Sequence, residues 1–400
     1  MQAKEALRYT FFSRKKQTVL PYAVLQGIIK ITHNRKAGTD MDYTAALKYH
    51  FTTKKGWVND PNGLCFFKGY YHIFYQHSPN FEKPWQENMH WGHARTKDFL
   101  TFEELPVALY PDKPYDKDGC WSGTAIVKDD ILFLFYASIH DGVQSVSVAY
   151  SEDGIRFEKY ENNPVIAHFP ADGCPDFRDP AVCYAQGKYY CVMASGNHEK
   201  QTANLLLYES EDLLRWEYKG ILCEWENAKF AECPSFMQAG DKYLLTASVC
   251  KQDSHRFSVM YGTFEDGRFT AEYTGEVDKG PDQYAGQVFL DPNGRIILIS
   301  WIPGWAYAGY KEKDLGCMSV PREIKLIDGK IYGFPTEEVQ HLMKDSDPAV
   351  LRVADGFIIE REGRDSVRYK GELKDLKIIR DEYILEVFIN GGEEIYSVLL

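Results

Sequence analysis

Five segments of equal length place the strongest constraint on the fold. Each is seventeen residues long and has a short strand, a turn and a more apolar strand, and successive segments begin 62, 57, 53 and 53 residues apart. They are residues 60–76, 122–138, 179–195, 232–248 and 285–301. A four-stranded unit repeated at this interval is typical of a β-propeller blade. The sequence therefore predicts an all-β fold with a five-bladed β-propeller spanning roughly 50 to 325.

A second motif recurs between these segments. It reads Ser/Thr-x-Asp-x-x-x-aromatic-Glu and occupies residues 96–103, 151–158 and 210–217. Such a motif predicts a hairpin turn that leads into a further strand. The tetrapeptide Asp-Pro-Asn-Gly, a strong turn signal, occurs at Asp60 and again at Asp291. The copy at Asp291 lies where its segment is expected to turn between two strands. The copy at Asp60 instead begins its segment.

The repeat also suggests where the domains divide. We assign residues 45–335 to the propeller and 336–400 to a small C-terminal β module. Because fifty residues of strand pattern are few for a complete two-sheet sandwich, we expect a shortened sandwich. Either a partner subunit, which would make the protein a homo-oligomer through this module, or residues 1–40 would then cover its remaining face.

Residues 1–44 differ from the rest and form a basic N-terminal extension. The first forty residues contain eight Lys or Arg against two acidic residues. The apolar patch at 19–29 makes a poor secretory signal, because Pro21, Gln26 and Gly27 interrupt it. We interpret the extension as an appended surface segment, or as sequence that precedes a natural start at Met41, and expect that deleting 1–40 leaves activity intact.

Composition excludes several functional classes. The net charge of −12 argues against nucleic acid and anionic membranes as partners, and no apolar run reaches eighteen residues. Nine cysteines without a Cys-x-x-Cys pair suit reduced thiols and a cytoplasmic location. His90 and His93 lie three apart on a predicted strand and face opposite sides, which favours packed histidines over a metal site. We expect no metal and no cofactor.

The position that opens each segment carries the chemistry. Inner strands of a propeller converge on one channel mouth, and this position is Asp60, Ser122, Asp179, Glu232 and Ala285 in turn. Three of the five are carboxylates, although Asp and Glu supply only 58 of 400 residues. Paired carboxylates, one ionised and one protonated, are what glycosidic bond cleavage requires. Because all three carboxylates occupy the same position in their segments, we favour a shared catalytic channel over unrelated turns.

Aromatic and polar residues near these positions suit a sugar. Flat indole rings stack on sugars, and amides, hydroxyls and guanidinium groups give directional hydrogen bonds. Arg178 and Asp179 could equally form a mere ion pair. Cys233 has no histidine beside it in the sequence, so a packed thiol is favoured over a nucleophile. The candidate sugar-binding residues are Trp57, Trp85, Trp91, Trp121, Trp301, Asn59, Gln76, Ser122 and Arg178.

Several blocks of the sequence resemble glycoside hydrolase family 32, the β-fructosidases, in the family's order. They include Trp57–Gly63, Phe74–Gln76, Met89–Ala94, Trp121–Thr124, Phe177–Pro180, Glu232–Pro234 and Ser319–Glu323. The resemblance implies a propeller followed by a β-sandwich. It implies Asp60 as nucleophile, Glu232 as general acid and base, and Asp179 with Arg178 as transition-state stabiliser. Asn59, Gln76, Trp85, Ser122 and Trp301 would shape the fructose pocket.

Two departures from the family pattern stand out. Phe230 and Ala231 precede Glu232 where the family usually has Trp, which puts the leaving-group subsite in doubt, and the C-terminal module is short. The implied function is a retaining β-fructofuranosidase acting on sucrose, sucrose 6-phosphate or short fructans. The alternatives are a fructosyltransferase, an inverting pentosidase such as an arabinosidase or xylosidase, or a non-catalytic sugar-binding propeller. The residues leave the preferred substrate and the balance of hydrolysis and transfer open.

Overall fold

The computed structural model describes residues 47–79, 88–197, 199–251, 254–302, 316–361 and 364–400. All of them belong to the unit Asp42–Leu400. The predictions made for residues 1–44 and for Trp85 therefore lie outside the described residues. Within them the structure is nearly all strand, with one short 3-10 helix, η2 (Glu337–Leu342).

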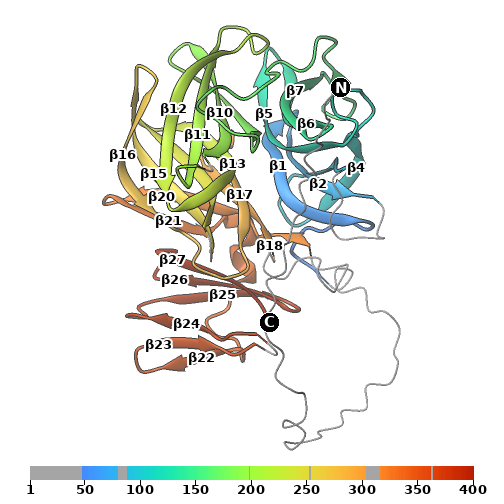
Figure 1. The fold of residues 1–400 in the computed structure, drawn as a ribbon. Coiled ribbons are helices and arrows are strands. Elements are labelled where there is room, and N and C mark those ends of the chain that lie inside the picture. The colour runs from blue at the N-terminus through green and yellow to red at the C-terminus, as the bar shows by residue number, and fades with distance from the viewer. Residues whose placement is uncertain (1–46, 80–87, 198, 252–253, 303–315, 362–363) are drawn as a thin grey trace, which may run out of the picture. The chain divides into compact units, whose positions relative to one another are not determined.

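Five antiparallel sheets follow one another along the chain (Figure 1). The first two are β1 (Trp57–Phe67), β2 (Tyr70–Ser78), β3 (His90–Thr96), β4 (Phe102–Leu109), and β5 (Gly119–Lys128), β6 (Ile131–His140), β7 (Val143–Ser151), β8 (Glu158–Lys159). The third is β9 (Arg178–Ala185), β10 (Lys188–Asn197), β11 (Thr202–Ser210), β12 (Glu217–Glu226). The fourth is β13 (Ala228–Ala239), β14 (Lys242–Lys251), β15 (His255–Glu265), β16 (Arg268–Gly275). The fifth is β17 (Tyr284–Leu290), β18 (Ile296–Ile302), β20 (Arg322–Ile327) and β21 (Lys330–Pro335), with β19 (Cys317–Met318) paired to β18.

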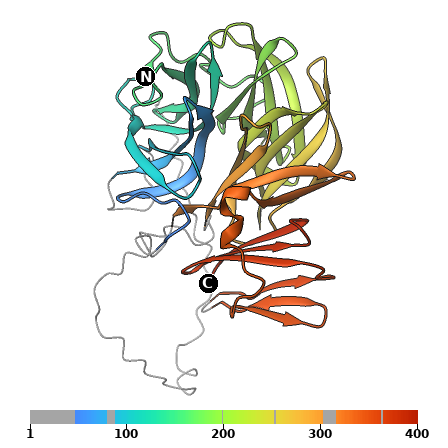
Figure 2. The same ribbon diagram turned by 180° about the vertical axis from the view of Figure 1, so that it is seen from behind.

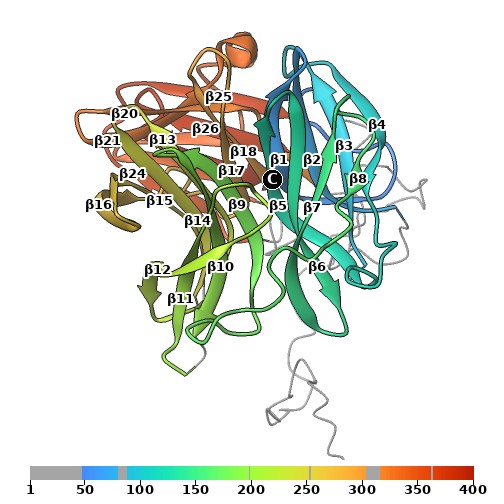
Figure 3. The same cartoon turned by 90° about the horizontal axis from the view of Figure 1, so that it is seen from above.

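The first strands of the five sheets form a ring. β1 contacts β5, β5 contacts β9, β9 contacts β13, β13 contacts β17, and β17 returns to β1. Viewed from above, β1, β5, β9 and β17 lie together near the centre (Figure 3). Apolar side chains fill the spaces between neighbouring blades, for example Ala181 and Val192 with Phe236 and Leu245 between blades 3 and 4. The predicted all-β, five-bladed propeller is confirmed.

The recurring turn motif has one structure in three blades. Thr96, Ser151 and Ser210 each place a hydroxyl beside the Asp two residues later. That Asp then accepts hydrogen bonds from two backbone N–H groups, such as those of Leu214 and Arg215 on Asp212. Local side-chain bonds of this kind favour a turn over continued strand. The motif thus joins β3 to β4, β7 to β8 and β11 to β12, as predicted.

The C-terminal module is a small sandwich. One sheet comprises β22 (Val350–Val353), β23 (Gly356–Ile359) and β24 (Val367–Lys370), and the other β25 (Leu376–Asp381), β26 (Ile384–Ile389) and β27 (Glu394–Leu399). An apolar core lies between the sheets and includes Phe357, Ile378, Leu385 and Val398. Figure 2 shows η2 between blade 5 and this module. The shortened sandwich agrees with the sequence prediction.

Blade 5 covers the other face of the β25–β27 sheet. Ile379, Phe388 and Ile395 share one apolar cluster with Val277 and Ile331 of the propeller. Asp278 also forms a β-bridge with Ile395. A partner subunit or residues 1–40 were expected to cover this face, but the propeller itself buries it. The β22–β24 sheet covers one face of β26 and blade 5 covers the other. Strand β26 therefore has apolar side chains on both faces.

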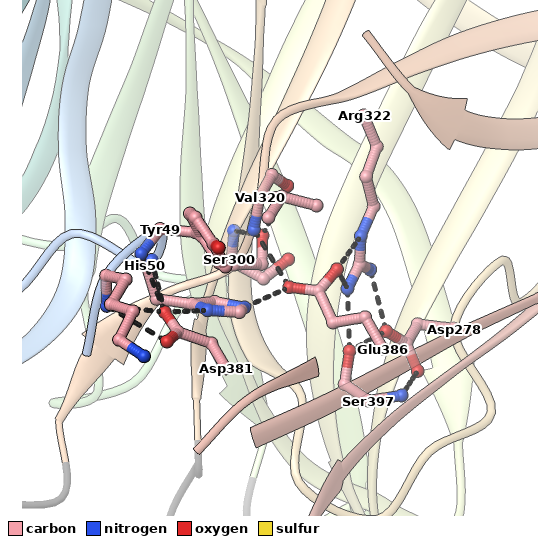
Figure 4. A network of polar contacts seen from close by, with 11 residues as sticks. Tyr49, His50, Asp278, Ser300, Val320, Arg322, Asp381, Glu386 and Ser397 are labelled. Carbon is pink, nitrogen blue, oxygen red and sulfur yellow. Dashed lines mark hydrogen bonds and ion pairs between the residues drawn. The ribbon is translucent and has the colours of Figure 1, made fainter. Parts of the chain in front are cut away.

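A buried polar network fastens the module to the propeller (Figure 4). The His50 ring contacts Asp381 at 3.0 Å and Glu386 at 2.9 Å. Arg322 donates to Glu386 at 2.7 Å and to Asp278 at 2.7 Å, and its side chain has no exposed surface. Burial opposes the charge of His50, but the two carboxylates prevail and raise its pKa to about 9. Each buried charge therefore has an opposite partner.

Candidate active site

A β-bulge interrupts all five inner strands at or within two residues of the position that opens each segment. Strand pairing shifts register between Val58 and Pro61, Trp121 and Gly123, Arg178 and Ala181, Glu232 and Ser235, and Tyr284 and Gln287. In the last three blades a residue other than glycine adopts a positive φ, namely Asp179 (57°), Cys233 (47°) and Ala285 (52°). Bulges next to active sites re-aim side chains, and backbone strain is concentrated there. The bulges are the local cause of the convergence that the repeat phase predicted.

Asp60 is held by one of its two carboxylate oxygens. Ser122 Oγ donates to Asp60 Oδ2 at 2.8 Å, and the Cys233 thiol donates to the same oxygen at 3.4 Å. Asp60 Oδ1 is buried and receives no well-formed hydrogen bond from the described residues. Burial raises the pKa of Asp60 to about 6, and the charge of Glu232 adds to the effect. One oxygen is thus oriented and the other is left for an incoming group.

Asp179 lies on the other side of Cys233. Its Oδ2 accepts the Cys233 backbone N–H at 2.8 Å and the thiol at 3.6 Å. The positive φ of Asp179 and of Cys233 brings these groups together. Burial raises the pKa of Asp179, and the charges of Glu232 and Asp60 act in the same direction against Arg178. Crowded carboxylates of this kind titrate as a group.

Glu232 is bound at both oxygens. Arg178 donates to Oε1 from Nε at 3.2 Å and from Nη2 at 2.9 Å, while its Nη1 holds Asp176 at 2.9 Å. The Tyr284 hydroxyl donates to Oε2, and the Cys250 thiol approaches the same atom at 3.7 Å. Because a hydroxyl both donates and accepts, Tyr284 can remain bonded to Glu232 whether or not that carboxyl carries a proton.

The predicted polar ligands surround this group. Asn59 accepts the Trp57 indole N–H at 2.8 Å, and Gln76 donates to the Cys120 carbonyl at 3.1 Å. Both amides are buried, and Gln76 Oε1 has no partner among the described residues. Trp121 is only partly buried beside them. Asn59, Gln76, Ser122, Arg178 and the three carboxylates therefore lie in one region.

Three of the tryptophans that were predicted to stack on sugar are buried among other side chains. Trp57 is 2% exposed, and Trp91 and Trp301 are fully buried. Trp57 packs edge-to-face on Trp301, with ring centroids 5.9 Å apart. Trp91 lies in the core between blades 1 and 2 and donates to the Trp121 carbonyl. Among the described residues these three rings are covered by other side chains, and their role in sugar binding stays a prediction.

Three residues of the site were missed or undervalued from sequence. Cys233 was predicted to be a packed thiol, and it is buried, but it also bridges Asp60 and Asp179. Tyr284 and Cys250 were not proposed at all. Tyr284 stands one residue before a segment start, as Asn59, Trp121 and Arg178 do. This shared position in the repeat could have identified Tyr284 as a site residue, whereas nothing in the sequence marks Cys250.

His93 is packed in the core, as the sequence analysis expected of a histidine that binds no metal. His72 and His93 share a hydrogen bond of 2.9 Å, and His93 stacks on Phe74 in the core. No group of His, Cys, Asp or Glu able to hold a metal ion occurs in the described ranges. Among those same residues, none lies in a helix long and apolar enough to cross a membrane.

Comparison with known proteins gives the family. The model of the N-terminal domain of glycosyl hydrolases family 32 matches residues 50–335. The chain belongs to glycoside hydrolase family 32. A sucrose-6-phosphate hydrolase of Zymomonas mobilis is 35% identical over 323 residues, which cover 74% of this chain and 62% of that protein. A sucrose-6-phosphate hydrolase of Escherichia coli is 31% identical over 365 residues, covering 86% and 74%.

Solved structures agree with this family 32 fold. A β-fructofuranosidase of Bombyx mori superimposes with a TM-score of 0.76 at 27% identity, covering 90% of this chain and 91% of that one. A mutant of the same enzyme was solved in complex with sucrose. This chain spans about three-fifths of the length of the Zymomonas relative, at 62%.

Proposed function

We propose that this protein is a retaining β-fructofuranosidase, which releases β-linked fructose from sucrose, sucrose 6-phosphate or short fructans. The observation that carries the proposal is the arrangement around Cys233. Ser122 and Cys233 hold one oxygen of Asp60, and Glu232, which is held by Arg178 and Tyr284, adjoins Cys233 in the chain. A nucleophile and a proton donor placed this way suit a double displacement.

The first step forms a covalent intermediate. Asp60 Oδ1 attacks the anomeric carbon of the fructosyl group, and the bond from that carbon to the leaving oxygen breaks. Glu232 transfers its proton to the leaving oxygen, which departs as an alcohol. Ser122 and Cys233 keep Oδ2 of Asp60 in place, so little reorganisation accompanies the attack. Asp179 would hold fructose hydroxyls as positive charge develops on the ring.

The second step reverses these roles. Glu232, now ionised, takes a proton from water as the oxygen attacks the anomeric carbon. The ester bond to Asp60 breaks, which restores its carboxylate and releases fructose. We expect the two carboxyl groups to lie about 5–5.5 Å apart, the spacing for a covalent intermediate. A separation of roughly 8 Å or more would favour inversion instead.

The stereochemistry of the first product tests the proposal. Proton NMR during the first seconds of sucrose hydrolysis should show β-fructofuranose before mutarotation. Asp60→Ala should retain the fold by circular dichroism and lose at least about 10³-fold in turnover. Initial release of the α-anomer, or full activity of Asp60→Ala, would overturn the assignment. Failure to cleave sucrose, sucrose 6-phosphate, inulin and levan would instead revive a non-catalytic sugar-binding propeller.

Transfer to sugar rather than water is the alternative within the same chemistry. Hydrolysis and transfer share the fructosyl–enzyme intermediate. They differ only in whether water or a sugar hydroxyl attacks it. Product analysis at high sucrose concentration would reveal fructose oligomers if sugar competes with water. We propose hydrolysis because the relatives that share 35% and 31% identity with this chain are named as hydrolases.

We also propose a cytoplasmic location and retain homo-oligomerisation through the C-terminal module as a proposal. All nine cysteines are free thiols, and eight of them are buried. Such thiols suit a reducing compartment. On β22, Leu351 is 60% and Val353 37% exposed, so an apolar strip is available to a second copy. Sedimentation of the wild type and of Leu351→Ser would test that association.

A further inference from the structure

Two carboxylates share the guanidinium of Arg178. Its Nε and Nη2 donate to Oε1 of Glu232 at 3.2 and 2.9 Å, whereas its Nη1 donates to Oδ1 of Asp176 at 2.9 Å. The Arg178 side chain is 9% exposed, and those of Asp176 and Glu232 are 27% and 20% exposed. Charges this close and this poorly solvated influence which carboxyl group carries a proton. The proposed proton donor therefore has an acidic neighbour on the same guanidinium.

The backbone around Asp176 is anchored to two neighbouring strands. The Asp176 carbonyl accepts the hydroxyl of Ser195 on β10 at 2.8 Å. The N–H of the next residue, Phe177, donates to Oε1 of Gln144 on β7 at 2.9 Å. Because an aspartate side chain is short, these contacts fix the position of the carboxylate as well. Asp176 is thus held where it meets Arg178.

Phe230 covers the same guanidinium from β13. The Arg178 Cζ lies over the Phe230 ring, 4.9 Å from its centroid. A cation over an aromatic face is attracted by the ring and loses part of its contact with water. Phe230 also packs against the buried cluster that contains Trp57 and Cys233. Two carboxylates and a ring therefore restrain Arg178, so its charge stays beside Glu232.

Glu232 has to give up a proton in the first step of the proposed mechanism. A guanidinium alone would favour the ionised carboxylate and so oppose proton delivery. The negative charge of Asp176 acts in the other direction, because it compensates Arg178 and repels a second negative charge nearby. Burial opposes the charge of Arg178, but the charges of Glu232, Asp176 and Asp179 prevail and raise its pKa. Arg178 thus remains a cation at every pH at which the enzyme folds.

Several further titratable groups face Glu232 from the strands around it. In the described ranges they are Asp60 on β1, Asp179 on β9, Cys233 on β13, Cys250 on β14, His255 on β15 and Tyr284 on β17. Burial raises the pKa of the two thiols and of the tyrosine, so these groups are neutral at neutral pH. Burial also lowers the pKa of His255. Besides Glu232, Asp176 is the carboxylate that forms an ion pair with Arg178 in this part of the chain.

We propose that Asp176 is a positioning residue, which counterbalances the charge of Arg178 and so keeps Glu232 able to deliver its proton to the leaving oxygen. This inference rests on the proposed function. Asp176 acts through Arg178 and takes no part in bond cleavage. A leaving group that must be protonated, such as the glucose of sucrose, should therefore depend on Asp176. A leaving group that departs as a stable anion should not.

The test compares two leaving groups. Asp176→Asn preserves the size of the side chain and removes its charge. At pH 8 its kcat/KM for sucrose should fall by about threefold to tenfold, and the basic limb of the pH profile should move to lower pH by roughly 0.5–1 unit. With nitrophenyl β-fructofuranoside, whose nitrophenolate departs without a proton, kcat/KM should change by less than about twofold. Asp172→Asn is the matched control and should alter neither substrate, since Asp172 is exposed in the same loop and binds the Tyr218 hydroxyl.

The outcomes separate this inference from the proposed function. Equal losses on both substrates, or a basic limb that stays in place, would give Asp176 a purely structural role and overturn the inference. Asp176→Glu retains the charge and should keep the wild-type limb, so a limb displaced as far as in Asp176→Asn would also contradict it. Failure of the wild type to cleave either substrate would instead overturn the β-fructofuranosidase proposal.

Discussion

The two Asp-Pro-Asn-Gly turns offer an internal test of how position controls a carboxylate. Asp60 sits at a bulge among other carboxylates, and its pKa is raised from 3.8 to about 6 by burial and by Glu232. For Asp291, burial acts in the same direction, but hydrogen bonds from the backbone and guanidinium of Arg295 lower its pKa. The same substitution, Asp→Asn, should therefore change stability in opposite directions at these two positions.

Proton linkage determines whether removing the charge of Asp60 raises or lowers the free energy of unfolding. The folded-state pKa of Asp60 lies above its unfolded value, so native stability falls as pH rises from about 4 to about 6. A shift of this size corresponds to at most about 3 kcal/mol at pH 8. Because the side chain is only partly buried and interacts with Asp179, we expect Asp60→Asn to stabilise the fold by about 1–2 kcal/mol at pH 8. At pH 4 the gain should vanish.

Asp291→Asn should do the reverse. Its carboxylate accepts the Arg295 N–H at 2.8 Å and the Arg295 Nε at 2.8 Å, and it accepts the Tyr71 hydroxyl at 3.2 Å. Asparagine keeps one acceptor and loses the charge, which should cost about 1–2 kcal/mol. Urea unfolding followed by tryptophan fluorescence at pH 4.5, 6 and 8 measures both variants. A stabilised Asp291→Asn, or an Asp60→Asn gain independent of pH, would refute the reasoning.

Further expectations concern pH and contacts. Wild-type kcat/KM should fall below about pH 6, because the pKa of Asp60 is about 6 and the nucleophile must be ionised; unchanged rates down to pH 4.5 would exclude it. Tyr284→Phe should lower kcat by about tenfold or more and shift the basic limb of the profile, whereas a purely structural role would leave that limb in place. Since the pKa of His50 is raised to about 9, its contribution to stability is complete below about pH 6.5 and is lost as pH rises through 9. His50→Gln should therefore lower the denaturation midpoint at pH 7 and remove this alkaline decline; a retained decline would contradict it. Deleting 1–40 should leave kcat/KM unchanged, and an inactive but folded deletion would show that the extension contributes to the site.

Much of the architecture was predictable because it is periodic. A hydrophobic pattern repeated at 53–62 residues requires equivalent strands to pack equivalently, so the blades and the common position of Asp60, Asp179 and Glu232 follow from sequence alone. The Ser/Thr-x-Asp turns were also predictable, since their hydrogen bonds join residues three apart or closer. Interactions within one repeat unit involve residues that are close in the chain, so they can be recognised as a short sequence pattern.

Interactions between blades leave no such signature, and the tertiary structure alone decided them. The bulges that aim the carboxylates arise from pairing with the second strand of each blade, and Cys233 meets Asp60 only because β1 and β13 converge at the channel mouth. Whether Trp57, Trp91 and Trp301 offer a face to sugar depended on which side chains cover them, which composition does not reveal. The closure of the short C-terminal module by blade 5 likewise joins residues about a hundred positions apart, as Asp278 and Ile395 do. Sequence therefore determined the fold and the chemical identity of the carboxylates, whereas packing between distant segments determined their contacts, their pKa values and the surface left for a substrate.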